Sequence, residues 1–166
     1  MLGAHRRRRR EVSSALDVLI PLVPTPWSAE AFIDRVAQNR GRPINLISYS
    51  LTSDDPTGYW LSYPDRDVIV VPDSAAGSRR DAIIAHELAH MMLGHLPMQA
   101  AGVDDPSALT ANMSPELVAR FLPRHGYQTI IEKEAESLST LLMAHIYARP
   151  TVETRTERGR ISDGLR

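Results

Sequence analysis

The sequence predicts a single α+β domain in which helices pack around a small, mainly antiparallel sheet of about three strands. Two patterns support this expectation. Residues 44–71 are rich in β-branched and aromatic side chains, whereas the segments before and after them have the three- and four-residue apolar spacing of helices. The chain has 166 residues, 43% of them hydrophobic, which is enough for one domain with its own core.

Two helices are predicted ahead of the strands. The first covers residues 11–20 and stops at a proline-rich link. The second runs to about Arg40, because Ser28 is a typical N-cap and Gly41 a typical C-terminal stop. Residues 1–10 contain five arginines and no acidic residue, and we expect them to form a basic disordered tail.

Three strands are predicted after Pro43, at residues 44–51, 59–63 and 67–71. The loop at 64–66 has the composition of a hairpin turn between the second and third strands. The third strand is apolar on both faces, so we expect it to be well covered. If it borders a cleft, it could accept an extended peptide by strand addition.

Further helices are predicted in the second half of the chain. One occupies residues 79–93, and a long irregular link at 97–113 follows it. A short helix at 114–123 precedes a last helix at 129–148. Residues 151–166 have almost no apolar side chains, and we expect them to form a disordered C-terminal tail.

Composition and charge exclude several classes of protein. The chain has no cysteine, which excludes disulfides, thiolate metal sites and cysteine nucleophiles, so any metal site must use His, Asp or Glu. The expected folded domain, residues 11–148, contains nine basic and 17 acidic side chains. An acidic body argues against direct binding of nucleic acid. No apolar run is long enough to span a membrane, and no export signal is evident, so we expect a cytoplasmic location.

The strongest functional signal is the segment His86-Glu87-Leu88-Ala89-His90, an H-E-x-x-H pattern. Helical residues four apart lie on one face, so the imidazoles of His86 and His90 can converge on one zinc ion. Zinc lowers the pKa of a bound water to about 7, and the carboxylate of Glu87 is close enough to take its proton. The pattern therefore predicts two zinc ligands and a general base on the active-site helix.

A catalytic zinc needs a third protein ligand, and the start of the last helix offers one. Glu132 and Glu136 are four apart and share a face, whereas Glu134 points elsewhere and is expected to be solvent-exposed. We expect Glu132 to be the third ligand and Glu136 to hold a ligand histidine by its other ring nitrogen. The alternative is an ordinary acidic first turn favoured by the helix dipole.

The remaining histidines fit the third-ligand position less well. A metzincin site would need a histidine at the position of Leu96, and His95 misses that register by one residue. We expect His95 to be structural or solvent-facing, with support of a zinc ligand as the alternative. His145 faces away from Glu136 on the last helix, and His125 lies in a loop that the pattern does not place.

Two segments resemble motifs of the ImmA/IrrE family of zinc metallopeptidases. Residues 86–95, H-E-L-A-H-M-M-L-G-H, are similar to H-E-L-G-H-L-L-L-G-H. Residues 132–143, E-K-E-A-E-S-L-S-T-L-L-M, are similar to the family's E-x-x-A-[DN]-x-F-A-x-x-L-L-M. The matched region is about residues 28–148, and Glu136 and Leu138 stand where the family has Asp or Asn and an aromatic residue.

This resemblance implies a zincin-like α+β domain with His86, His90 and Glu132 as zinc ligands and Glu87 as the catalytic base. Tyr127 is a candidate donor to the oxyanion. Family members regulate helix-turn-helix repressors, often by cleaving them, and some are toxin partners of an adjacent antitoxin. The resemblance thus implies a metallopeptidase that acts on a repressor or antitoxin. The alternative is a non-proteolytic zinc-binding regulator, or toxin–antitoxin component, that acts only by protein–protein binding.

Overall fold

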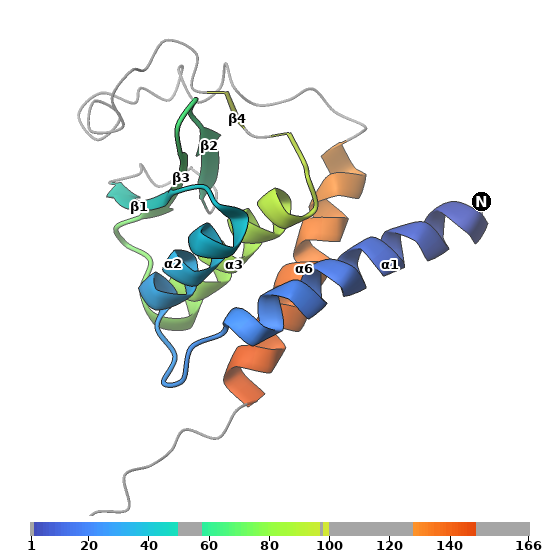
Figure 1. Cartoon of the computed structure of the whole chain (residues 1–166), viewed down its shortest axis with the longest axis horizontal. Coiled ribbons are helices and arrows are strands. Elements are labelled where there is room, and N and C mark those ends of the chain that lie inside the picture. Colours follow the sequence, from blue (N-terminus) through green and yellow to red (C-terminus); the bar gives the residue numbers. More distant parts are fainter. Residues whose placement is uncertain (1, 50–57, 97, 100–127, 149–166) are drawn as a thin grey trace, which may run out of the picture.

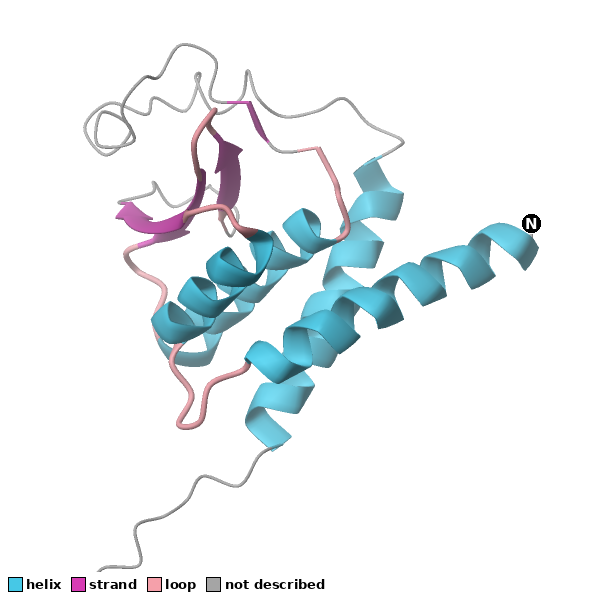
Figure 2. Ribbon diagram, viewed as in Figure 1, coloured by secondary structure: helices cyan, strands magenta, loops and turns pink. Residues whose placement is uncertain are grey.

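The computed structural model of the chain describes residues 2–49, 58–96, 98–99 and 128–148. These residues form an α+β fold, as predicted, with the helices on one side of a small sheet (Figures 1 and 2). Most of the link expected at 97–113, the helix expected at 114–123 and the tail at 151–166 lie outside the described residues. None of the helices in the described part is long and apolar enough to cross a membrane.

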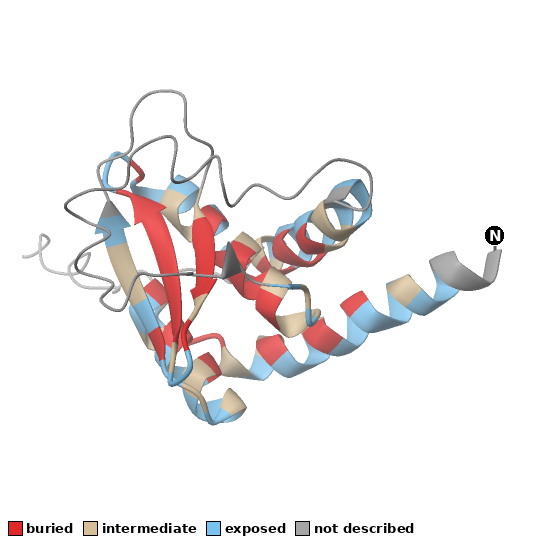
Figure 3. Cartoon of the chain, turned by 90° about the horizontal axis from the view of Figure 1, so that it is seen from above, coloured by how far each residue is buried: buried red, intermediate tan, exposed pale blue. Residues whose placement is uncertain are grey.

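Helix α1 spans Leu2–Leu19, so the expectation of a disordered tail over residues 1–10 is wrong. Arginine is a good helix former, and a buried stripe of Val12, Ala15 and Leu19 anchors the helix to the body. A short 3-10 helix, Ile20–Leu22, ends this first segment. The first turns of α1 extend past the rest of the fold (Figures 1 and 3).

Helix α2 spans Ala29–Arg40 and has the predicted ends. The Ser28 hydroxyl accepts a hydrogen bond from the backbone N–H of Ala31 at 3.2 Å, which satisfies one of the free donors of the first turn. Gly41 closes the helix in the left-handed region, with φ of 64°. The sequence signals for this helix are therefore confirmed at both ends.

The sheet is mixed, and the expectation of a mainly antiparallel sheet is wrong. Its strands are β1 (Ile44–Tyr49), β2 (Tyr59–Ser62), β3 (Asp67–Pro72) and the two-residue β4 (Met98–Gln99), in the order β1-β3-β2-β4. The hairpin of β2 and β3 is antiparallel, as predicted. However, β1 pairs in parallel with β3, and β4 pairs in parallel with β2. In the sequence, β2 comes between β1 and β3, but in the sheet β3 lies between β1 and β2. Strands β1 and β3 therefore run in the same direction, and β2 runs in the opposite one.

Strand β3 is the central strand, and all six of its residues are buried. Its good coverage is thus confirmed. Because β1 and β2 flank it on both sides, its backbone groups are already paired and it has no free edge. The expectation that this strand could accept an extended peptide is therefore wrong.

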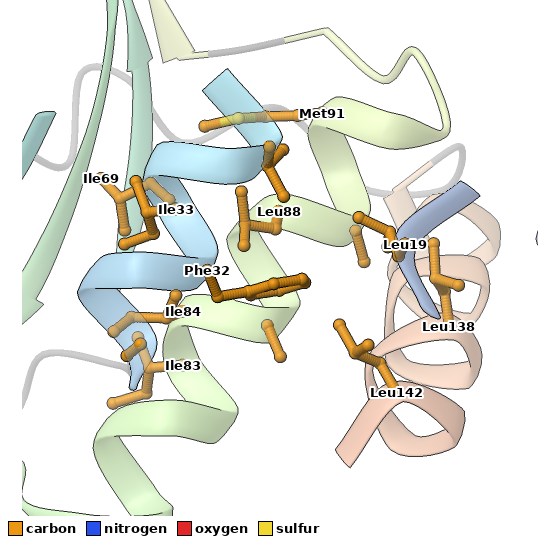
Figure 4. Close-up of a cluster of buried hydrophobic side chains, with 14 of the residues drawn as sticks. Leu19, Phe32, Ile33, Ile69, Ile83, Ile84, Leu88, Met91, Leu138 and Leu142 are labelled. Atoms are coloured by element: carbon orange, nitrogen blue, oxygen red, sulfur yellow. The ribbon is translucent and has the colours of Figure 1, made fainter. Parts of the chain in front are cut away.

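Helices α3 (Gly77–Met92) and α6 (Gln128–Ala148) form the layer that carries the site. In Figure 4, Ile69 of the sheet faces Ile33 of α2 and Leu88 of α3, and Leu138 of α6 lies on the far side. These side chains belong to one continuous core that also includes Leu19 of α1. The core therefore runs from the sheet through α2 and α3 to α6 and α1.

A polar contact ties the start of α3 to the end of α6. One carboxylate oxygen of Asp81 accepts hydrogen bonds from the Trp27 indole N–H at 2.8 Å and from the Tyr147 hydroxyl at 2.7 Å. The hydrogen bond to Asp81 raises the pKa of the Tyr147 phenol to about 12. Three segments that are distant in the sequence thus meet at one side chain.

Candidate metal centre

Three potential ligand atoms converge between α3 and α6. His86 Nε2 lies 3.0 Å from His90 Nε2 and 3.3 Å from Glu132 Oε2. His90 Nε2 lies 3.6 Å from the same Glu132 oxygen. One ligand atom from each of the three residues lies within 4.8 Å of the others, so the group could hold a metal ion. The structure brings together the three residues that the sequence predicted as ligands.

The burial pattern of the two helices explains this convergence. On α3, Leu88 and Ala89 are buried in the core, which leaves His86 and His90 on the face toward α6. On α6, Ala135 and Leu138 are buried, and Glu132 precedes Ala135 by three residues on the same side. The apolar side chains pack α3 against α6. The side chains of His86, His90 and Glu132 meet at the partly exposed margin of this contact.

Glu136 lies beside the other ring nitrogen of His86, as predicted. The distance from its Oε2 to His86 Nδ1 is 3.6 Å, which is close enough for an ion pair but longer than a hydrogen bond. The Glu136 carboxylate is largely exposed. It is therefore near enough to orient His86 but is not held rigidly by the protein.

Glu87 lies in the contact between α3 and β2. It is only 8% exposed and accepts a hydrogen bond from the backbone N–H of Trp60. Burial, followed by the negative charge of Glu132, raises the pKa of Glu87 to about 8, although the Trp60 N–H acts in the opposite direction. In the metal-free protein this carboxyl group is therefore mostly protonated at neutral pH.

Gly58, just before β2, allows the close approach of this strand to α3. A Cβ on Gly58 would lie 2.4 Å from Ile83 Cγ2 and 3.1 Å from the carbonyl oxygen of Val70. It would also lie 3.6 Å from Glu87 Oε1. The missing side chain thus helps β2 to cover Glu87.

His90 is neutral in this environment. Burial is the largest cause and lowers its pKa to about 4, although the nearby Glu132 carboxylate acts in the opposite direction. Neutral imidazole is the form that binds metal ions. Burial also lowers the pKa of His95, the neighbouring ring, although Glu134 acts in the opposite direction.

His95 and Glu134 form a second layer behind His90. The ring of His95 is in contact with His90, with the two Nδ1 atoms 3.0 Å apart. On its other side, His95 Nε2 lies 3.4 Å from Glu134 Oε2. The Glu134 side chain is only 20% exposed and pairs with Arg8 at 3.1 Å, so its expected solvent exposure is wrong. It is covered because α1 packs along this side of α6.

Tyr127 and His125 lie outside the described residues. His145 is described, but it does not belong to the group that could hold a metal ion.

Arg8 is the residue that the sequence analysis missed. A signal was available, because Arg8 continues the buried stripe of Val12, Ala15 and Leu19 at helical spacing. Extending that stripe toward the N-terminus would have placed Arg8 on the face that meets α6.

Comparison with protein-family models, with curated proteins and with solved structures finds no match to this chain.

Proposed function

We propose that this chain is a zinc-dependent metallopeptidase with a zincin-like fold, which regulates a helix-turn-helix repressor or antitoxin in the cytoplasm. The convergence of His86, His90 and Glu132 beside a buried Glu87 is the observation that carries the proposal. The partner class rests on the motif resemblance.

The donor set fits zinc. Two neutral imidazole nitrogens and one carboxylate oxygen are a common protein ligand set of catalytic zinc, which leaves a fourth position open. His86 and His90 supply the nitrogens and Glu132 the oxygen. When bound, zinc would supply a Lewis acid that polarises the scissile carbonyl and makes water a stronger acid.

The proton chemistry falls to Glu87. A general base works best when its pKa lies near the working pH, and burial has moved this carboxyl group into that range. A nearby cation would lower the pKa again and favour the ionised form that acts as a base. Glu87 would then accept a proton from the attacking water and later donate it to the leaving amine nitrogen.

Metal content tests the ligand set directly. Elemental analysis of the purified chain should give about one zinc per molecule, and Glu132→Ala should lose most of it. Lys133→Ala is the matched control, because this neighbouring side chain is exposed and should retain the metal. A wild-type protein that remains metal-free in the presence of zinc would contradict the proposal.

Peptide cleavage separates an enzyme from a regulator that only binds. The wild-type chain loaded with zinc is incubated with a library of unstructured peptides, and the products are read by mass spectrometry. We expect cleavage by the wild type and none by Glu87→Gln, although both retain zinc. If neither variant cleaves and both bind a repressor equally well, the protein acts by binding alone.

A further inference from the structure

A row of four polar side chains leads from α1 to one of the proposed metal ligands. Arg8 Nε lies 3.1 Å from Glu134 Oε1, and Glu134 Oε2 lies 3.4 Å from His95 Nε2. His95 Nδ1 then lies 3.0 Å from His90 Nδ1. The other nitrogen of His90, Nε2, faces His86 and Glu132. The row therefore ends on the side of His90 that is turned away from the proposed metal position.

The donors and acceptors in this row allow one consistent arrangement. A guanidinium group only donates hydrogen bonds, and a carboxylate only accepts them. Glu134 pairs with Arg8 and turns an oxygen that can only accept toward Nε2 of His95, so a His95 ring with a single proton carries that proton on Nε2. The Nδ1 of His95 is then an acceptor, and the only partner it faces in the row is Nδ1 of His90. The proton of His90 is thereby placed on Nδ1, which leaves the lone pair of Nε2 free.

We propose that Arg8, Glu134 and His95 are positioning residues that fix the tautomer and ring orientation of His90, so that its Nε2 lone pair is presented to the metal before the metal binds. This inference rests on the metal site of the proposed function. It makes α1, which lies outside both motifs, a working part of the metal centre.

Burial supports a positioning role rather than a chance surface contact. The His95 side chain is 8% exposed, and Arg8 is held on the face of α1 that packs against α6. Ligand histidines usually donate their second ring N–H to a partner that holds the ring. His90 has a covered partner of this kind, whereas within the described part of the chain the Nδ1 of His86 faces the exposed carboxylate of Glu136 at 3.6 Å. The two histidine ligands are therefore supported unequally.

A competing explanation would be a second metal site at His95 and Glu134. Among the described residues, only His86, His90 and Glu132 form a group whose ligand atoms converge sufficiently. The two nitrogens of His95 face different residues, His90 on one side and Glu134 on the other, so His95 and Glu134 bring only one pair of ligand atoms together. A hydrogen-bonded support for His90 is the simpler function of this row.

Long-range ¹H–¹⁵N NMR of the metal-free full chain tests the tautomers directly. We expect His95 protonated at Nε2 and His90 protonated at Nδ1. Glu134→Gln should disturb this pattern, because the amide of glutamine can donate a hydrogen bond to His95 Nε2. Arg7→Ala is the matched control, because Arg7 pairs with Glu11 on the surface of α1 and its loss should leave both rings unchanged. A His95 ring protonated at Nδ1 in the wild type would overturn the proposal.

Zinc affinity, measured by competition with a chelator, gives an independent readout. His95→Gln should weaken binding by about 10- to 100-fold, as is typical when the partner of a ligand histidine is removed. Arg8→Ala should weaken it less, Arg8→Lys should restore part of the loss, and Arg7→Ala should match the wild type. Unchanged affinity in His95→Gln would overturn the proposal.

The two measurements also keep this inference separate from the proposed function. If the wild type binds zinc but cleaves no peptide, the peptidase proposal fails while the affinities still decide the role of His95. If the wild type binds no zinc, the metal site fails, and the positioning role in zinc binding fails with it, even where NMR shows the expected tautomers. Thermal unfolding of the metal-free variants, with melting points close to the wild type, shows that any loss of affinity is not a loss of the fold.

Discussion

Asp67 and Glu87 are both buried carboxyl groups, but their surroundings shift their pKa values in opposite directions. Asp67 is 1% exposed, and its Oδ2 lies 2.8 Å from Arg40 Nη1 and 3.1 Å from Arg42 Nε. Burial alone would raise the pKa of Asp67, but hydrogen bonds from the two arginines outweigh it and hold the pKa below its usual value. Among the residues that the structure describes, no such cation acts on the pKa of Glu87, and burial dominates.

The difference separates a structural carboxylate from a reactive one. Asp67 is kept ionised at neutral pH and ties the end of α2 to the start of β3. The pKa of Glu87 is raised to about 8, close to neutral pH, and this carboxyl group follows the potential ligand His86 in the sequence. Two buried carboxyl groups therefore have pKa values shifted in opposite directions, and the nearest charged side chains decide the direction.

The largest expected effect is on catalysis. Glu87→Gln should lower kcat/KM for peptide hydrolysis by roughly 10²- to 10⁴-fold, because proton transfer by this side chain is lost. The stability of the metal-free protein at neutral pH should change little, since glutamine is a neutral replacement for a carboxyl group that is already mostly protonated. Steady-state kinetics and urea denaturation measure the two effects. A variant that keeps full activity would contradict the assignment of Glu87.

The reverse pattern is expected for Asp67. Asp67→Asn should destabilise the fold by about 3 kcal/mol, because it leaves the charges of Arg40 and Arg42 without their buried partner. Urea denaturation measures the change. Asp65→Asn is the control, because Asp65 is exposed where it pairs with Arg66, and its loss should cost no more than about 0.5 kcal/mol. Equal losses of unfolding free energy in Asp67→Asn and Asp65→Asn would show that the burial of Asp67 with its two arginines does not add to stability.

The stabilising effect of Asp67 should also depend on pH. Its pKa is lowered in the folded state, so its stabilisation is fully present above the unfolded-state value of about 3.9 and is lost as pH falls through the folded value. The difference in unfolding free energy between the wild type and Asp67→Asn should therefore shrink as the pH falls below about 4. Urea titrations at several pH values test this. A difference in unfolding free energy that grows in acid would contradict the lowered pKa of Asp67.

The smallest effect concerns the cover over Glu87. Gly58→Ala should destabilise the protein by about 1 to 3 kcal/mol, because the added methyl group would overlap the side chain of Ile83. The cost should be smaller in an Ile83→Ala background, which removes the overlapping Cγ2 atom. A double-mutant cycle with urea denaturation measures this coupling, and two additive effects would argue against the close contact.

The three residues that could hold a metal ion were predictable because their signals are local. The spacing of His86 and His90 fixes one face of α3 whatever surrounds it. The choice of Glu132 required only that a second helix should bring an acidic residue to that face. Helix α2 was predictable for the same reason, since its cap and its stop lie within the segment itself.

The errors arose where a distant segment changes the environment. Glu134 faces away from Glu132 on α6, but α1 covers that side and turns an expected surface residue into a partner of His95. The parallel pairing of β1 with β3 likewise depends on where the chain returns to the sheet. The arginine run looks like a solvated tail by composition, whereas the apolar stripe that follows it carries the helix back through residues 2–10.

Two polar contacts, one near each end of α6, join this helix to α3. Near one end, Glu132 meets the histidines of α3, and near the other, Tyr147 is hydrogen-bonded to Asp81. A helix with one such contact could rotate about it, and a second contact far from the first opposes that rotation. Tyr147 thus lies far along the helix from the proposed metal position and still limits how far Glu132 can swing away from it. The two contacts are separated by most of the length of α6.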